Sequence, residues 1–148
     1  MNYNEVEVLL VEDNMEDAEL TIYTLKKINL ANHLFHVKDG AEALDFIFAK
    51  GEYKARLMVN KPRVILLDIK MPKVDGIQVL RKIKGNKATK SIPVVIMTSS
   101  KEEQDMIASY NLGVNSYVVK PIETLEFVKA VSDLGLFWLI INQTPHSL

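Results

Sequence analysis

Side chains that can bind a metal ion or an anion follow four apolar segments of the chain, each at the point where the segment ends. Glu12 and Asp13 follow the first segment, Asp68 the second, Thr98 the third and Lys120 the fourth. Carboxylates gathered at one place raise one another's pKa unless a cation joins them, and their oxygens suit Mg²⁺. A lysine and a hydroxyl nearby would bind an added anion. The set therefore predicts a site that takes a phosphoryl group beside a metal ion, with a carboxylate as nucleophile.

Alternating strand and helix patterns would bring these residues together. Short apolar runs predict five strands, over residues 6–11, 34–37, 63–67, 93–97 and 116–119. Apolar residues at helical spacing predict helices over residues 16–28, 41–50, 76–84, 101–111 and 124–134. The first, third and fourth strands are apolar on both faces, as central parallel strands are. The expected fold class is α/β: a doubly wound, five-stranded parallel sheet with helices on both faces, and with its site at the carboxyl ends of the strands.

Polar residues mark the starts of two of these helices. Asn14 or Asp13 is the expected N-cap of the first helix, and for Asp13 this role is compatible with metal binding. Ser100 and Glu103 have the spacing of a capping box, which predicts the start of the fourth helix.

Length, composition and charge narrow the class of protein. The chain has 148 residues, enough for one domain, and its net charge of −1 argues against a dedicated nucleic-acid binder. The absence of cysteine excludes disulfides and thiolate chemistry. The polar start is unlike a signal peptide, and the apolar runs are far shorter than a membrane span. We therefore expect a cytoplasmic protein that binds neither nucleic acid nor membrane, with one domain over residues 1–142 and a tail over residues 143–148.

Five stretches of the sequence, taken in order, resemble the receiver domains of two-component response regulators. They read V-L-L-V-E-D-N, D-G-A-E-A-L, V-I-L-L-D-I-K-M-P-K-V-D-G, V-V-I-M-T-S-S and S-Y-V-V-K-P-I, and the resemblance covers residues 5–135. It implies the flavodoxin-like strand order 2-1-3-4-5. It also implies a signalling switch of a phosphorelay, which assists its own phosphorylation and dephosphorylation, rather than an enzyme.

The resemblance implies a role for each residue of the expected site. Asp68 would accept the phosphoryl group from a phosphohistidine on a sensor histidine kinase. Glu12 and Asp13 would bind Mg²⁺ together with Asp68 and the backbone carbonyl of Lys70. Lys120 would pair with Asp68 and with the phosphoryl oxygens.

Four further residues would support the site or carry the response. Thr98 would move toward the phosphoryl group and Tyr117 would follow it inward, although plain packing is the alternative for Tyr117. Ser99, being small, would leave the phosphoryl group accessible. A cis peptide bond before Pro121, a form found in about 5–6% of X–Pro bonds, would aim Lys120 into the site.

Two segments extend a minimal receiver. Residues 51–62 are long for a connection between a helix and a strand, and form either a solvated insertion or a contact for a particular kinase. From about residue 135 the chain enters an apolar run, in which Phe137 and Trp138 are candidate anchors of a homodimer or partner interface. Folding back onto the domain's own core is the alternative for this run. Both segments resemble small stand-alone receivers paired with phytochrome-type histidine kinases, and we expect this chain to be one of them, acting through protein contacts.

Other functions with the same expected fold remain as alternatives. A haloacid-dehalogenase-like phosphatase needs a second acid two residues after its nucleophile, where this chain has Lys70. A flavodoxin-like cofactor binder is disfavoured because Glu12 and Asp13 would repel a flavin phosphate. The last alternative is a receiver that binds partners without phosphorylation. The presence of every expected site residue argues against it.

Overall fold

A sheet of five parallel strands lies at the centre of the fold, in the order β2-β1-β3-β4-β5. The computed structural model describes residues 2–71, 74–114, 116–136 and 139. The strands are β1 (Val8–Val11), β2 (Leu34–Val37), β3 (Val64–Asp68), β4 (Val94–Thr98) and β5 (Tyr117–Val119). The helices are α1 (Met15–Lys27), α2 (Gly40–Ile47), α3 (Gly76–Lys84), α4 (Lys101–Ser109) and α5 (Thr124–Asp133), with short 3-10 helices η1 (Tyr3–Glu5) and η2 (Gly51–Tyr53). The fold class and the strand order expected from the sequence are confirmed.

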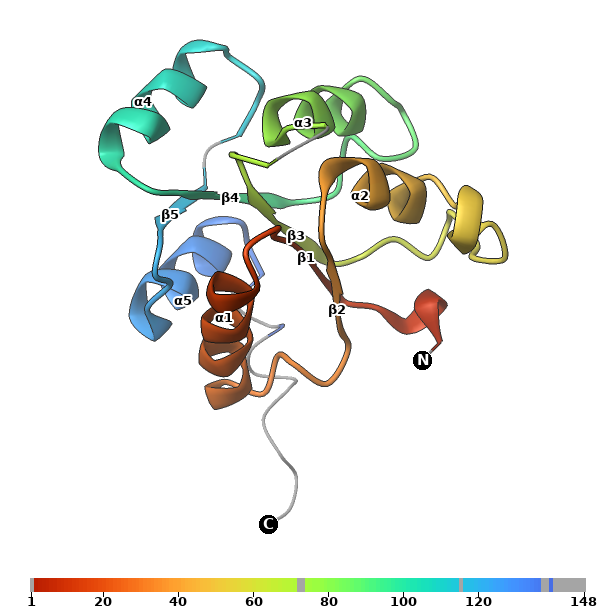
Figure 1. The fold of residues 1–148 in the computed structure, drawn as a ribbon, viewed down its shortest axis with the longest axis horizontal. Helices are drawn as coiled ribbons and strands as arrows, with labels where there is room; N and C mark the ends of the chain where they lie inside the picture. The colour runs from red at the N-terminus through yellow and green to blue at the C-terminus, as the bar shows by residue number, and fades with distance from the viewer. Residues whose placement is uncertain (1, 72–73, 115, 137–138, 140–148) are drawn as a thin grey trace.

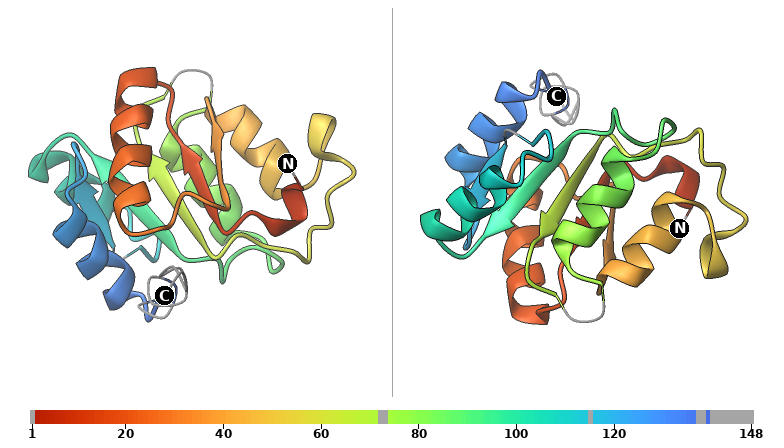
Figure 2. Two further views of the ribbon diagram at one scale, coloured as in Figure 1. Left: turned by 90° about the horizontal axis from the view of Figure 1, so that it is seen from below. Right: turned by 90° about the horizontal axis from the view of Figure 1, so that it is seen from above.

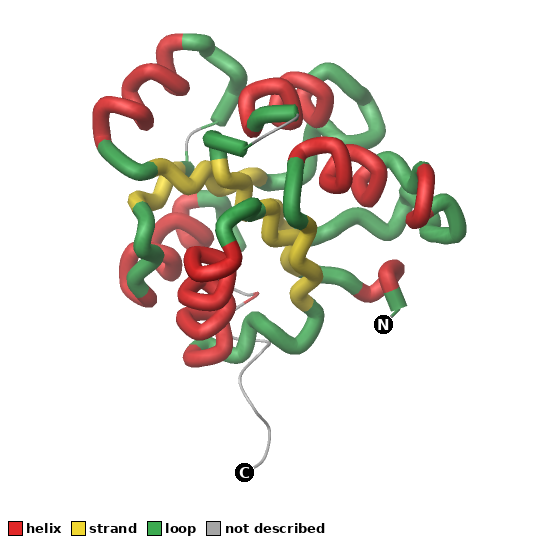
Figure 3. Tube along the Cα trace, in the orientation of Figure 1, coloured by secondary structure: helices red, strands yellow, loops and turns green. Residues whose placement is uncertain are grey.

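Helices cover the two faces of the sheet in separate layers. α1 and α5 lie on one face, and α2, α3 and α4 lie on the other (Figure 1). The view from below has α1 and α5 in front of the sheet, and the view from above has α2 and α3 in front of it (Figure 2). The trace coloured by secondary structure shows the strands between the two layers (Figure 3). Because both faces are covered, every residue of β1, β3 and β4 is buried. None of the helices in the described ranges combines the length and apolarity needed to cross a bilayer.

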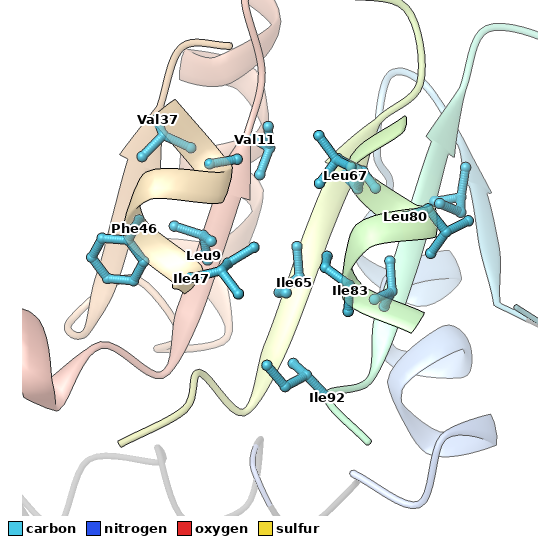
Figure 4. Packing of buried hydrophobic residues seen from close by; sticks show 14 of the residues in the cluster. Leu9, Val11, Val37, Phe46, Ile47, Ile65, Leu67, Leu80, Ile83 and Ile92 are labelled. Atoms are coloured by element: carbon cyan, nitrogen blue, oxygen red, sulfur yellow. The ribbon is translucent and has the colours of Figure 1, made fainter. Parts of the chain in front are cut away.

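Each face of the sheet has its own hydrophobic core. The core beneath α2, α3 and α4 includes Leu9, Ile65 and Phe46, which are fully buried (Figure 4). The core beneath α1 and α5 includes Leu10 and Leu66. Side chains alternate across a strand, so each central strand contributes to both cores. Packing on both faces holds each central strand in place, and with it the residues at its carboxyl end.

The end of α2 differs from the prediction. The helix ends at Ile47 rather than at residue 50, because Ala49 adopts a left-handed φ of 54°. The Lys50 N–H then donates to the Asp45 carbonyl at 2.8 Å, as in a Schellman motif. A non-glycine residue in this conformation gives no signal in the apolar spacing, which is why the spacing placed the end too late.

Residues 51–62 pack against the domain through Tyr53, Arg56 and Pro62, which are buried. Tyr53 and Arg56 are buried, each 4% exposed. The Arg56 guanidinium donates to the carbonyls of Phe46 and Ile47 at the end of α2, at 2.7 and 3.3 Å. It also donates to the Asn60 carbonyl at 2.8 Å. The expectation of a solvated segment is therefore wrong for Tyr53 and Arg56, because Arg56 satisfies helix carbonyls that have no partner within the helix.

Part of the apolar C-terminal run returns to the domain's own core. Leu136 and Leu139 are buried beneath α1 and α5, and the Leu139 N–H donates to the Leu136 carbonyl at 2.8 Å. Phe137 and Trp138, the candidate interface anchors, and residues 140–148 lie outside the described residues. Folding back is thus correct for the two leucines, and the interface stays a prediction.

Candidate functional site

The sheet places the predicted site residues at one edge. Glu12 directly follows β1, Asp68 is the last residue of β3, and Lys120 directly follows β5. Because the strands are parallel, their carboxyl ends meet at the same edge of the sheet. β1 and β3 are hydrogen-bonded neighbours, with Val11 paired to Leu67, so the residues that follow this pair lie next to each other.

Three carboxylates form a cluster at this edge. One oxygen from each of Glu12, Asp13 and Asp68 lies within 4.8 Å of the others. Glu12 and Asp68 are buried, whereas Asp13 is exposed. Oxygen donors of this kind fit a hard divalent cation such as Mg²⁺. The three acids border a pocket of about 230 Å³, whose other lining residues are Asn14, Asp17, Lys70, Ser99, Glu103 and Lys120.

The charge on Asp68 is costly in this environment. Burial, followed by the hydrogen bond and the charge of Glu12, raises the pKa of the Asp68 carboxyl to about 8 against the opposing effect of Lys120. A cation between the carboxylates would favour their ionised forms and remove this cost. The acidic cluster therefore has the oxygen donors that a divalent cation binds. A cation there would also offset the cost of ionising Asp68.

Lys120 is placed among the acids. Its Nζ lies 3.2 Å from Glu12 Oε1 and 3.0 Å from Asp17 Oδ2. It lies 3.5 Å from Asp68 Oδ2. Burial lowers the pKa of Lys120, but the hydrogen bond with Asp17 and the charges of Asp68 and Glu12 outweigh burial and hold the pKa above its ordinary value. The ammonium of Lys120 therefore stays charged beside Asp68. The peptide bond that joins Lys120 to Pro121 is cis.

Thr98 and Tyr117 make contacts away from the acids. The fully buried Thr98 hydroxyl donates to the Val118 carbonyl on β5 at 3.5 Å, and the Tyr117 hydroxyl donates to the Val114 carbonyl at 3.0 Å. Burial raises the pKa of Tyr117. Of the described residues at the end of β4, Ser99 lines the pocket and Thr98 does not. The switch roles expected for Thr98 and Tyr117 stay predictions.

Two acids of the pocket were missed by sequence reasoning. Asp17 binds Lys120, and its place in the first turn of α1, shortly after Glu12 and Asp13, was a signal that could have found it. Glu103 was expected to complete a capping box. Its backbone N–H does donate to Ser100 Oγ at 3.1 Å, but its carboxylate binds Ser99 and Lys70 instead.

Glycines allow close packing of the connection between β3 and α3, which carries Lys70. At Gly76 a Cβ would lie 2.6 Å from the Ile69 Cα, and the Gly76 N–H donates to the Ile69 carbonyl at 3.1 Å. At Gly40, the first residue of α2, a Cβ would overlap the Val74 carbonyl. Ile69 and Val74, at the two ends of this connection, are therefore held against α3 and α2 at positions where no side chain fits.

Most of the chain is similar in sequence to known proteins of one family. The sequence matches the response regulator receiver domain over residues 8–132. It is 41% identical over 132 residues to the response regulator Rcp1 of Synechocystis sp., covering 89% of this chain and 88% of that protein. It is 35% identical over 138 residues to the probable methanogenesis regulatory protein FilR2 of Methanothrix harundinacea, covering 93% of this chain and 86% of that protein.

Solved structures agree with the sequence matches. The bacteriophytochrome response regulator AtBRR is 52% identical with a TM-score of 0.85, covering 90% of this chain and 96% of that chain. The Mn²⁺-bound form of Rcp1 is 41% identical with a TM-score of 0.69, covering 89% of this chain and 93% of that chain. With the acidic pocket at the carboxyl edge of its β2-β1-β3-β4-β5 sheet, this chain belongs to the response regulator receiver domain family.

Proposed function

We propose that this receiver accepts a phosphoryl group on Asp68 from a phosphohistidine of a sensor histidine kinase, with Mg²⁺ at the acidic cluster. The proposal rests on the position of Asp68, which is 3% exposed and lies beside the ammonium of Lys120 at 3.5 Å. Its oxygen also lies within 4.8 Å of oxygens from Glu12 and Asp13. Membership of the receiver family supports the same assignment.

In this transfer a carboxylate oxygen of Asp68 attacks phosphorus. A new O–P bond forms while the N–P bond of the phosphohistidine breaks, and its electron pair stays on the histidine nitrogen. Glu12, Asp13, Asp68 and the Lys70 carbonyl would hold Mg²⁺, which offsets the negative charge of the carboxylates and the phosphoryl oxygens when bound. The Lys120 ammonium would pair with a phosphoryl oxygen. The Mn²⁺-bound form of the related Rcp1 supports metal use in this fold.

Thr98 would pass the change at Asp68 to the protein surface. Its hydroxyl makes a long 3.5 Å bond to the Val118 carbonyl, so a charged phosphoryl oxygen offers a better acceptor. Movement of Thr98 would shift the start of α4, and Tyr117 would repack against β4. A change in population from 1:99 to 99:1 requires about 5.5 kcal/mol of differential binding between the two arrangements. The surface formed by β4, α4 and β5 would then bind its protein partner differently.

We propose a phytochrome-type histidine kinase as the source of the phosphoryl group. The support is similarity to two proteins named as bacteriophytochrome response regulators, AtBRR at 52% identity and RtBRR at 49%. The exposed side chains of Leu57 and Val59, in the segment between α2 and β3, are candidates for a contact that distinguishes one kinase from another.

Metal dependence is the first test of this function. Incubation with acetyl phosphate and Mg²⁺ is expected to add one phosphoryl group, about 80 Da, to the intact mass of the protein. Excess chelator is expected to prevent the addition, because without a cation the pKa of Asp68 stays raised and the carboxylate that attacks phosphorus is scarce. An adduct of the same yield in chelator would contradict the role of the metal. Absence of both the adduct and beryllofluoride binding would favour a receiver that acts without phosphorylation.

A homodimer anchored by the C-terminal apolar run is a second prediction. Trp138→Ala is expected to weaken self-association at least tenfold in sedimentation velocity, since buried aromatic anchors dominate interfaces. Leu125→Ala is the matched control, because Leu125 is an exposed apolar side chain on α5 outside this run. An unchanged balance of monomer and dimer in the Trp138 variant would contradict the interface.

A further inference from the structure

Glu103, in the first turn of α4, places a buried carboxylate at the pocket of Asp68. Its side chain is 6% exposed. One of its oxygens accepts a hydrogen bond from the Ser99 N–H at 3.0 Å. The other accepts from Ser99 Oγ at 3.3 Å and lies 3.1 Å from Lys70 Nζ. Three donors from the connections after β3 and after β4 thus converge on one buried anion.

Helix capping does not account for these contacts. Ser100 Oγ accepts the Glu103 N–H and caps α4, but both oxygens of Glu103 are used by Ser99 and Lys70. The Glu103 carboxylate therefore lies in a site built from donors that bind anions: a backbone N–H, a hydroxyl and an ammonium.

The same donors are placed to bind a phosphoryl group on Asp68. Ser99 and Lys70 line the pocket with Asp68, and the Lys70 backbone N–H already donates to Asp68 Oδ1 at 3.4 Å. A phosphoryl group brings close to two negative charges and three acceptor oxygens. Charge-assisted hydrogen bonds to such oxygens are stronger than neutral ones. A phosphoryl group and the Glu103 carboxylate would therefore need the same donors, and they would repel each other.

Carboxylates outnumber ammonium groups in the pocket, which strengthens the competition between Glu103 and a phosphoryl group for the same donors. The pocket lining contains five carboxylates but only two ammonium groups among the described residues: Glu12, Asp13, Asp17, Asp68 and Glu103 against Lys70 and Lys120. One of the two ammonium groups, that of Lys70, is paired with Glu103. Removal of the Glu103 charge would free this cation for an incoming anion.

We propose that Glu103 is a positioning residue that competes with the phosphoryl group for the Ser99 N–H and the Lys70 ammonium, and so favours the phosphate-free arrangement. The inference rests on the proposed function, because it requires a phosphoryl group on Asp68. Without phosphate, Glu103 ties α4 to the connections after β3 and β4. With phosphate, Ser99 and Lys70 turn to the phosphoryl oxygens, and the first turn of α4 loses this anchor.

The test is the affinity of the full chain for beryllofluoride, which stands for the phosphoryl group, measured by calorimetry in Mg²⁺. Glu103→Ala is expected to bind about tenfold more tightly than the unsubstituted chain, and Glu103→Gln about threefold. The isosteric Gln variant decides the result if the Ala variant does not fold. Glu102→Gln is the matched control, because it removes an exposed charge from the same helical turn and is expected to bind like the unsubstituted chain.

The outcomes distinguish failure of the proposed role of Glu103 from failure of the proposed phosphoacceptor role of Asp68. Tighter binding by the Glu103 variants alone supports the competition. Equal or weaker binding by these variants, while the unsubstituted chain binds, overturns the inference and leaves the phosphoacceptor proposal standing. Absence of binding by the unsubstituted chain overturns the proposed function and the inference together. A purely structural role would lower the unfolding temperature of the Glu103 variants without tightening the binding.

Discussion

Asp68→Asn is expected to abolish the phosphoryl adduct completely. An amide oxygen cannot replace the carboxylate as nucleophile, and the substitution also turns one of the three carboxylates of the acidic cluster into an uncharged amide. The measurement is intact mass after incubation with acetyl phosphate and Mg²⁺. Asp75→Asn is the matched control, because asparagine keeps the N-cap of α3 and only the charge is lost. A full adduct in the Asp68 variant would place the acceptor elsewhere.

The same variant is expected to be more stable than the unsubstituted chain when metal is removed. In the folded state the pKa of Asp68 is raised to about 8 by burial and by Glu12, from 3.8 in the unfolded chain. A raised carboxyl pKa means that folding favours the protonated form, so stability falls as the pH rises from about 4 to about 8. The Asp68→Asn substitution would remove this fall, because the amide does not ionise. The measurement is the midpoint of urea unfolding in chelator at several pH values. The same dependence of this midpoint on pH in the two proteins would contradict the prediction.

Gly40→Ala is expected to damage the fold and the metal site together. A Cβ at this position would overlap the Val74 carbonyl oxygen and lie 2.7 Å from the Val74 carbonyl carbon. Val74 belongs to the connection that follows Asp68 and carries Lys70, so relief of the overlap must move this connection. Overpacking of this kind costs about 1–3 kcal/mol. We expect a loss of this size in the free energy of unfolding, measured in urea, together with weaker Mg²⁺ binding in titrations.

Gly85→Ala is the matched control for this substitution. Gly85 has an ordinary φ of −84°, and its Cβ would lie 3.0 Å from a single atom, the Arg81 carbonyl oxygen. A small shift relieves that contact, so Mg²⁺ binding should stay unchanged. Equal effects of the two glycine substitutions on metal binding would show that the close approach to Val74 does not position the site.

The layered arrangement of the fold could be predicted from the sequence because the central strands are apolar on both faces. Runs such as residues 64–67 and 94–97 have no polar face to expose, which requires helices on both sides of the sheet. Once the strands are parallel, Glu12, Asp68 and Lys120 must share one edge, so their proximity followed from their places at strand ends. The order of the strands came from the resemblance to receivers, since strand patterns alone do not give it.

The contacts that the sequence did not predict are made by side chains whose direction depends on packing. Glu103 has the spacing of a capping residue, and only the position of Ser99 and Lys70 relative to α4 decides that its carboxylate turns to them. Arg56 is a charged residue in a long connection, where a solvated side chain is the ordinary expectation. Its burial depends on the carbonyls of Phe46 and Ile47, which accept from its guanidinium at the end of α2, where the left-handed Ala49 ends the helix.

Arg56 anchors the segment before β3 on a different part of the fold from the proposed switch residues. Its guanidinium ties the segment before β3 to α2 and stacks on the Phe46 ring at 4.6 Å, whereas the proposed switch residues lie on β4, α4 and β5. Leu57 and Val59 are exposed on this anchored segment, and neither lines the pocket of Asp68. Evolution could therefore alter the choice of partner at this surface while the energetics of signalling stay the same.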